Sequence, residues 1–124
     1  MGTSLKALTL WQPWASLIVD GRKTIETRPR AWHYIGEVAI HAGLHVDWEA
    51  CVRFGYDPDT IARGAILGTA FKAGCVQFPH FSAPPDVYGD FAPGRFGYLL
   101  YRIKKFSAPI PAKGHQGFWD WNGN

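Results

Sequence analysis

Apolar and polar residues alternate along several short stretches of the chain with the two-residue period of a β-strand. In Gly36–Ala42 this alternation places an apolar set on one face and Glu37 and His41 on the other. Gly68 and Gly97 fall inside the two longest apolar runs and predict bulges or a close approach of neighbouring backbones. We therefore expect strands over Leu5–Leu10, Thr24–Arg28, Gly36–Ala42, Ala65–Ala73 and Phe96–Phe106.

A helical period interrupts the strand pattern near the N-terminus. Pro13 is well suited to the first position of a helix, and apolar side chains recur after it at helical spacing. Gly21 stands where a left-handed C-cap is needed, so we expect a helix from Pro13 to Val19 or Asp20. The unpaired N–H groups at the start of such a helix, together with its dipole, can bind an anion.

The rest of the chain adds a second helical segment and one long loop. Val46–Arg63 has helical content, with Asp47 as its N-cap. Gln77–Gly94 is rich in Pro, Phe and Tyr, and we interpret it as a loop at the rim of the fold. Because strands outnumber helices and do not alternate with them, we predict a single domain over residues 1–124. Its expected class is α+β, a small mostly-β barrel with one or two inserted helices.

The composition is that of a folded domain without a membrane segment. Hydrophobic residues make up 47% and charged residues 19% of the 124 residues, far from the profile of a disordered chain. The first residues lack a leader pattern, and no apolar run approaches the roughly 20 residues that cross a bilayer. We therefore expect a cytoplasmic protein, and a monomer, in which Cys51 and Cys75 stay as thiols in the core.

Positive charge is concentrated near the predicted helix, although the formal net charge is only +3. Lys23 offers a mobile charge and Arg28 a planar fork for phosphate, while a solvated charged turn is the alternative interpretation. Glu26 and Arg28, two residues apart on one face of a strand, can also hold each other in an ion pair without any ligand. The cations of this stretch are Arg22, Lys23, Arg28 and Arg30.

A series of sequence blocks extends over essentially the whole chain. These blocks are Gln12–Ile18, then Gly21, Lys23, Glu26 and Arg28, then Gly36–Ala42, Gly64–Gly68, Tyr88–Gly97 and Pro109–Trp119. Together they resemble the ASCH domain family of the PUA-like superfamily. The resemblance implies a PUA-like β-barrel with a cleft between the helix start and the strand from Lys23 to Arg28. In the family this cleft is regarded as an RNA- or nucleotide-binding surface.

From the residues and the resemblance we expect recognition of RNA, another single-stranded nucleic acid or a modified nucleotide, without bond cleavage. In this hypothesis Lys23, Arg28 and Lys113 hold phosphate, Trp14 stacks on a base, and Glu26 accepts from an exocyclic amine. The expected ligand-binding residues are Gln12, Pro13, Trp14, Lys23, Glu26, Arg28, His41, Lys113, His115 and Gln116.

A hydrolase acting in the same cleft is the alternative. One branch of the family hydrolyses N4-acetylcytidine with a lysine, a threonine three positions later and a distant glutamate. Lys23 matches the lysine, but Glu26 stands at the threonine position, so Thr24 would have to supply the hydroxyl. The stretch Gly68–Lys72, where the glutamate is expected, holds no acid. A ribonuclease would need acid–base groups, for which the candidates are Lys23, Glu26, His41 and His115.

The histidines and cysteines do not form a recognisable metal site. His33, His41 and His45 lack the spacing of zinc ligands, and neither cysteine lies beside them, so we expect no metal and no cofactor. A third hypothesis is a protein partner that docks on the exposed Pro- and Phe-rich loop within Phe78–Phe91.

Overall fold

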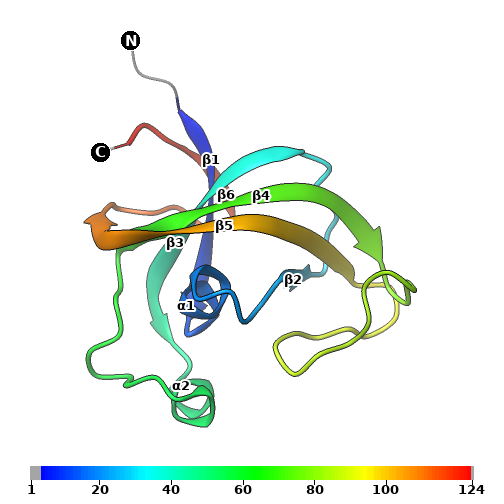
Figure 1. The fold of residues 1–124 in the computed structure, drawn as a ribbon, viewed down its shortest axis with the longest axis horizontal. Helices are drawn as coiled ribbons and strands as arrows, with labels where there is room; N and C mark the ends of the chain where they lie inside the picture. Colours follow the sequence, from blue (N-terminus) through cyan, green and yellow to red (C-terminus); the bar gives the residue numbers. More distant parts are fainter. Residues whose placement is uncertain (1–3, 124) are drawn as a thin grey trace.

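Six strands curl around one short helix in the computed structural model, which describes residues 4–123 (Figure 1). A second short helix lies apart from the sheet, beyond the end of β3 (Figure 1). The elements in chain order are β1 (Leu5–Gln12), α1 (Trp14–Val19), β2 (Ile25–Arg28), β3 (Gly36–Val46), α2 (Trp48–Phe54), β4 (Ala65–Gln77), β5 (Phe96–Pro111) and β6 (Phe118–Trp121).

The strands form a single sheet in the order β2-β5-β4-β3-β1-β6. The β1–β3 pair is parallel, because α1 and β2 lie between these strands in the chain and serve as the crossover; the other pairs are antiparallel. The predicted α+β, mostly-β class is confirmed. The sheet is curled but not closed, since β2 and β6 stand at its two edges, so the expected barrel is an open one.

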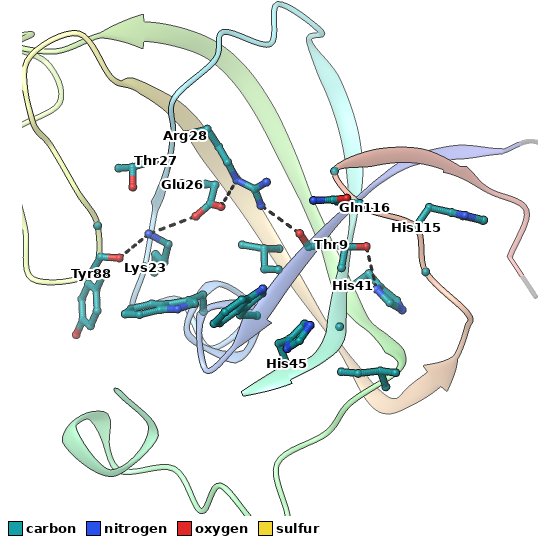
Figure 2. Close-up of a pocket in the computed structure, with 18 of the residues that line it drawn as sticks. Thr9, Lys23, Glu26, Thr27, Arg28, His41, His45, Tyr88, His115 and Gln116 are labelled. Carbon is teal, nitrogen blue, oxygen red and sulfur yellow. Dashed lines mark hydrogen bonds and ion pairs between the residues drawn. The ribbon is translucent and has the colours of Figure 1, made fainter. Parts of the chain in front are cut away.

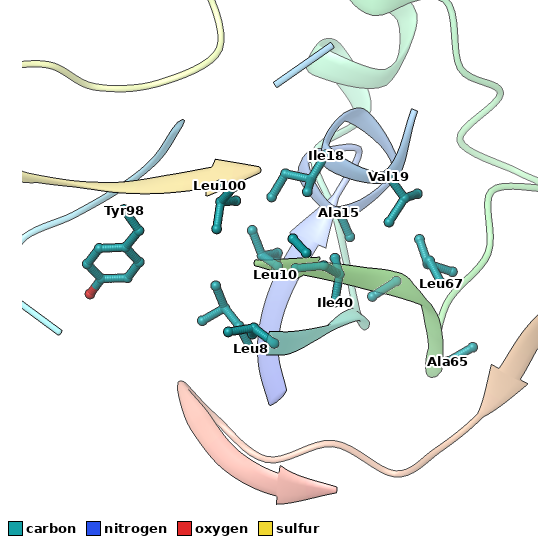
Figure 3. Close-up of a cluster of buried hydrophobic side chains, with 13 residues drawn as sticks. Leu8, Leu10, Ala15, Ile18, Val19, Ile40, Ala65, Leu67, Tyr98 and Leu100 are labelled. Atoms are coloured by element: carbon teal, nitrogen blue, oxygen red, sulfur yellow. The ribbon is translucent and has the colours of Figure 1, made fainter. Parts of the chain in front are cut away.

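The main core lies between α1 and the concave face of the sheet (Figure 3). Ala15 and Ile18 of α1 are fully buried against Leu8, Leu10 and Ile40 of the sheet. Burial of aliphatic side chains of this size contributes about 1.5–3 kcal/mol each before the entropy of ordering is deducted. This packing fixes α1, and with it the residues on either side of the helix.

Gly68 confirms the predicted close backbone approach, whereas Gly97 makes room for neighbouring side chains. A Cβ at Gly68 would lie 2.2 Å from the carbonyl oxygen of Lys104 on β5, and the β4–β5 register shifts between Ile66 and Gly68. A Cβ at Gly97 would lie 2.6 Å from the ring of Phe78. Gly68 therefore allows the irregular pairing of the two long strands that gives the sheet its curl.

The helix signals were largely correct, with shifted bounds. Helix α1 begins at Trp14, with Pro13 as the preceding N-cap, and it ends before Gly21, which has a positive φ of 79°. The Asp47 carboxylate caps α2 by accepting from the Ala50 N–H at 3.0 Å. Helix α2 is much shorter than the predicted helical segment, because Gly55 ends it in the left-handed conformation.

The helices, the possible metal ligands and the two cysteines were also the subject of predictions from the sequence. Within residues 4–123, neither helix has the length and apolar character needed to cross a bilayer. The same residues contain no group of three or more side chains suited to hold a metal ion. Both cysteines are free thiols, but Cys75 is partly exposed, so the expectation that both lie in the core is correct for Cys51 and not for Cys75.

Candidate ligand-binding groove

A groove of about 1610 Å³ crosses the molecule beside α1, and we call it the groove throughout (Figure 2). Its floor is formed by residues of β1, β2 and β3, including Thr9, Glu26 and His41. One wall is the loop 87–90 and the other is the segment 111–117 that links β5 to β6. The groove thus joins parts of the chain that are distant in sequence.

Cations outnumber acids among the residues that line the groove. The lining contains five lysine or arginine residues and two carboxylates, Glu26 and Asp90. A concave surface with one dominant sign of charge attracts ligands of the opposite sign. The five cations are Lys23, Arg28, Arg53, Arg95 and Lys113.

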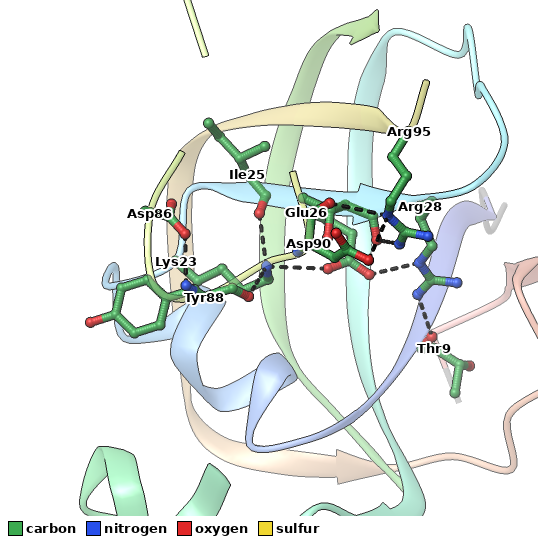
Figure 4. Close-up of polar contacts among 10 residues, drawn as sticks. Thr9, Lys23, Ile25, Glu26, Arg28, Asp86, Tyr88, Asp90 and Arg95 are labelled. Atoms are coloured by element: carbon green, nitrogen blue, oxygen red, sulfur yellow. Dashed lines mark hydrogen bonds and ion pairs between the residues drawn. The ribbon is translucent and has the colours of Figure 1, made fainter. Parts of the chain in front are cut away.

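A buried ion-pair cluster forms the floor at the β2 end (Figure 4). The Glu26 carboxylate lies 2.7 Å from Arg28 Nε and 3.5 Å from Lys23 Nζ. Arg28 also donates from a terminal nitrogen to the Thr9 carbonyl at 3.1 Å, which links β2 to β1. The predicted Glu26–Arg28 ion pair is therefore present, and Lys23 joins it.

Lys23 is an internal residue, which corrects the expectation of a mobile charge. Its side chain is 2% exposed, and its ammonium donates to the carbonyls of Ile25 and Tyr88, each at 2.8 Å. Together with Glu26 these carbonyls occupy the three donors of an ammonium group. Burial lowers the pKa of Lys23, and the negative charge of Glu26 opposes this change. Lys23 therefore positions the wall loop and Glu26.

Gln12 and Pro13 do not line the groove, contrary to the expectation that they contact a ligand. Both are buried, and the Gln12 amide is used inside the protein. Its Oε1 accepts from the Ser16 N–H at 3.0 Å, and its Nε2 donates to the Ala62 carbonyl at 2.8 Å and to the Ser16 hydroxyl at 2.9 Å. The Gln12 side chain therefore occupies the start of α1, where an anion was expected.

Two tryptophans line the groove in different ways. Trp14 is partly buried, meets Phe54 edge-on with centroids 5.9 Å apart, and has Lys23 Nζ 5.8 Å from its ring centroid. Trp11 is 55% exposed and stacks on His45, with ring centroids 4.9 Å apart and planes at 25°. The ring open to a ligand is thus that of Trp11 more than that of the predicted Trp14.

His41 is buried and held on both ring nitrogens. Nε2 lies 2.8 Å from the Ala112 carbonyl, which can only accept, so this nitrogen carries the proton. Nδ1 then accepts from the Thr9 hydroxyl at 3.1 Å, and Thr9 accepts from Trp119 Nε1 at 2.9 Å. Burial lowers the pKa of His41, in keeping with a neutral ring. These contacts give His41 a structural role in fixing the segment 111–117 to the sheet.

The remaining predicted residues divide between the groove and the outside. Lys113, His115 and Gln116 are exposed and line the groove together, as the sequence blocks suggested. Thr24 is exposed and does not line it, so the hydroxyl that the amidohydrolase hypothesis needs lies elsewhere. Arg53 and Arg95 line the groove and were not predicted, because only the tertiary fold brings α2 and the end of the long loop to this surface.

The sequence of this chain matches a known domain family. The ASCH domain family model matches residues 8–89, which include Lys23, Glu26, Arg28 and the loop that Lys23 anchors. This chain belongs to the ASCH domain family. Comparison with curated proteins gives no match.

Solved structures of similar fold include an ASCH protein from Zymomonas mobilis. It is 21% identical, with a TM-score of 0.55 over 86% of this chain and 72% of that chain. A variant of that protein with one tyrosine replaced by phenylalanine has a TM-score of 0.57 at 21% identity, over 88% of this chain and 76% of that chain. At this identity the likeness shows that the ASCH domain described here shares their fold.

Proposed function

We propose that the groove binds RNA, another single-stranded nucleic acid or a modified nucleotide. The observation that carries the proposal is the excess of cations in one concave surface, contributed by α2, β2 and the turn before it, the long loop and the segment 111–117. Phosphate contacts by lysine and arginine supply most of the affinity of proteins for nucleic acids. Lys23 is buried, but a ligand with several phosphates can meet the other four cations together, whereas a neutral ligand gains nothing from their charge.

Arg28 is the best placed of the predicted phosphate ligands. Its side chain is 26% exposed, and its contacts with Glu26 and Thr9 hold the guanidinium in one orientation. These contacts use two of the five N–H donors of a guanidinium, which leaves donors for a ligand. A pre-oriented fork loses less side-chain entropy on binding than a free one. Lys113, which is exposed, supplies a second cation from the opposite wall.

Glu26 gives the floor of the groove an acceptor among the cations. A carboxylate there accepts from an exocyclic amine of a base and repels a misplaced phosphate, so it favours one orientation of a nucleotide. Glu26 is 7% exposed and lines the groove, so a ligand reaches its carboxylate through the groove. In this proposal Arg28 and Lys113 position the phosphates, while Glu26 and Gln116 read the base.

A hydrolase is the second candidate function, and the Lys23–Glu26 pair is the observation in its favour. A buried lysine with a lowered pKa beside a carboxylate in a groove is a common feature of catalytic sites. Thr24 lies outside the groove, which weighs against it as the nucleophile, whereas Thr27 of β2 lines the groove and its hydroxyl accepts from the Asp90 N–H at 3.0 Å. A reaction on RNA would need another group to activate the 2′-hydroxyl.

The proposal is tested by titrating the protein into short labelled oligonucleotides at two salt concentrations. The oligonucleotides are RNA, single-stranded DNA and a duplex. Lys113→Ala should weaken binding across sequences and reduce the salt slope by about one. Lys104→Ala is the matched control, because Lys104 is an exposed lysine that does not line the groove. The proposed function would be refuted if the protein showed no salt-dependent binding, or if Lys113→Ala and Lys104→Ala had equal effects. Cleavage products in the same samples would favour the hydrolase.

A further inference from the structure

Trp11 projects into the groove from an irregular point of the sheet. In the β1–β3 ladder Leu10 pairs with Ala42 and Gln12 with Val46, so Trp11 alone stands opposite the β3 residues between Ala42 and Val46. Extra residues in one strand of a pair bend it and re-aim neighbouring side chains. Leu10 and Gln12, on either side of Trp11, point into the core, so the strand period turns Trp11 outward.

The indole ring of Trp11 is accessible and is supported by a second ring. Trp11 is 55% exposed, and the ring of His45 stacks on the indole with centroids 4.9 Å apart. His45 restricts the rotation of the indole, so part of the entropy cost of a stacking contact is met before a ligand binds. Both rings line the groove, together with the exposed Leu44 and the Arg53 cation of α2.

The dimensions of the groove suit a strand more than a single small molecule. Its volume of about 1610 Å³ exceeds the roughly 300–1,000 Å³ of ordinary small-molecule pockets. Its cations outside the buried cluster of the floor come from separate parts of the surface, with Arg53 on α2, Arg95 at the end of the long loop and Lys113 in the segment 111–117, as phosphates along a strand would require. The faces of bases inside a duplex are covered by neighbouring pairs, so an exposed indole can stack on an unpaired base but not on a pair within the helix.

We propose that the Trp11–His45 pair is a stacking platform for an unpaired base of a single strand bound in the groove. This inference rests on the proposed function and makes it more specific: the ligand is a strand with unstacked bases, and Trp11 provides the discrimination against duplex. The cations of the groove contact the backbone in single strand and duplex alike. The platform adds affinity for the single strand.

The test measures binding of a short fluorescein-labelled oligoadenylate and of a blunt RNA duplex of equal length by anisotropy. Trp11→Ala should weaken oligoadenylate binding roughly 5- to 150-fold and leave duplex binding and the salt slope unchanged. Trp11→Phe should restore part of the loss, because a phenyl ring still stacks. Trp48→Ala is the matched control, since Trp48 is 54% exposed and does not line the groove.

The outcomes separate this inference from the proposed function. If the wild-type protein binds neither probe, the proposed function fails and the platform with it. If the wild type binds with a clear salt dependence but Trp11→Ala matches Trp48→Ala, the proposed function stands and the platform is refuted. Equal losses for oligoadenylate and duplex in Trp11→Ala would also overturn the platform. Circular dichroism of each variant establishes that it is folded.

Discussion

Replacement of Glu26 by glutamine should destabilise the protein strongly, because it leaves Lys23 charged and buried without its main counter-charge. Lys23 is 1% exposed, and Glu26 Oε1 lies 3.5 Å from its ammonium. Removal of one partner of a buried pair costs about 3–5 kcal/mol. Because Arg28 on the other side of Glu26 is partly exposed and can be solvated, we expect about 3 kcal/mol for Glu26→Gln. The measurement is the free energy of unfolding in urea.

A double-mutant cycle isolates the pair from other effects. Lys23→Met combined with Glu26→Gln should give a coupling energy of about 1–3 kcal/mol. The control is the surface pair of Lys6 and Asp120, whose atoms are closer, at 2.8 Å, but whose side chains are 44% and 61% exposed. Exposed pairs couple by about 1 kcal/mol or less. A coupling for Lys23 and Glu26 no larger than that of the control would refute the argument from burial.

The pH dependence of stability gives a second measurement on the same variants. The pKa of Lys23 in the folded protein is lowered from its ordinary value of 10.5 by burial, so the folded protein releases this proton before the unfolded chain does. Stability from this group therefore increases as the pH rises toward 10.5. Loss of the Glu26 charge removes the main opposing influence, so the increase should begin at lower pH in Glu26→Gln. It should be absent in Lys23→Met.

Two further predictions concern the sheet. Gly68→Ala should cost about 1–3 kcal/mol in thermal unfolding, because its Cβ would overlap the Lys104 carbonyl at 2.2 Å, whereas Gly74→Ala, with nothing within 4 Å, should cost much less. Equal effects would contradict the close approach. Tyr98→Phe should lose about 1 kcal/mol at neutral pH, since Tyr98 donates to the Arg30 carbonyl at 2.8 Å. Burial raises the pKa of Tyr98 to about 12, so the wild-type advantage should disappear as the pH rises from 10 to 12, where the unfolded phenol ionises first. An advantage that persists at pH 12 would contradict this.

Local signals in the sequence were sufficient for the elements. The alternation in Gly36–Ala42, the Asp47 cap and the left-handed Gly21 each depend on a few neighbouring residues, and the structure confirms all three. The α+β class was predicted from the number and order of the elements, and the ASCH family from sequence blocks. Bounds were less accurate: β3, β4 and β5 all run longer than expected, because hydrogen bonds to neighbouring strands extend them beyond the apolar runs.

The roles of the site residues depended on contacts between distant segments. Lys23 was expected to be mobile, but the Tyr88 carbonyl, 65 residues away, accepts from it and buries it. Gln12 was expected in the cleft, but the Ala62 carbonyl, 50 residues away, holds its amide inside. No local pattern reports such partners, because the desolvation and hydrogen bonding of a side chain are set by whatever the fold places around it.

By itself, the sequence determined which segments are strands or helices, where the caps and close glycines lie, and which family the chain resembles. These are consequences of backbone preference and of apolar periodicity, which act over a few residues. The tertiary structure alone decided which polar side chains face the groove, which are buried beneath it, and that Trp11 is more exposed than Trp14. The physical reason is that exposure and pairing are properties of the surroundings of a side chain, and in this fold those surroundings come from segments that are distant in sequence.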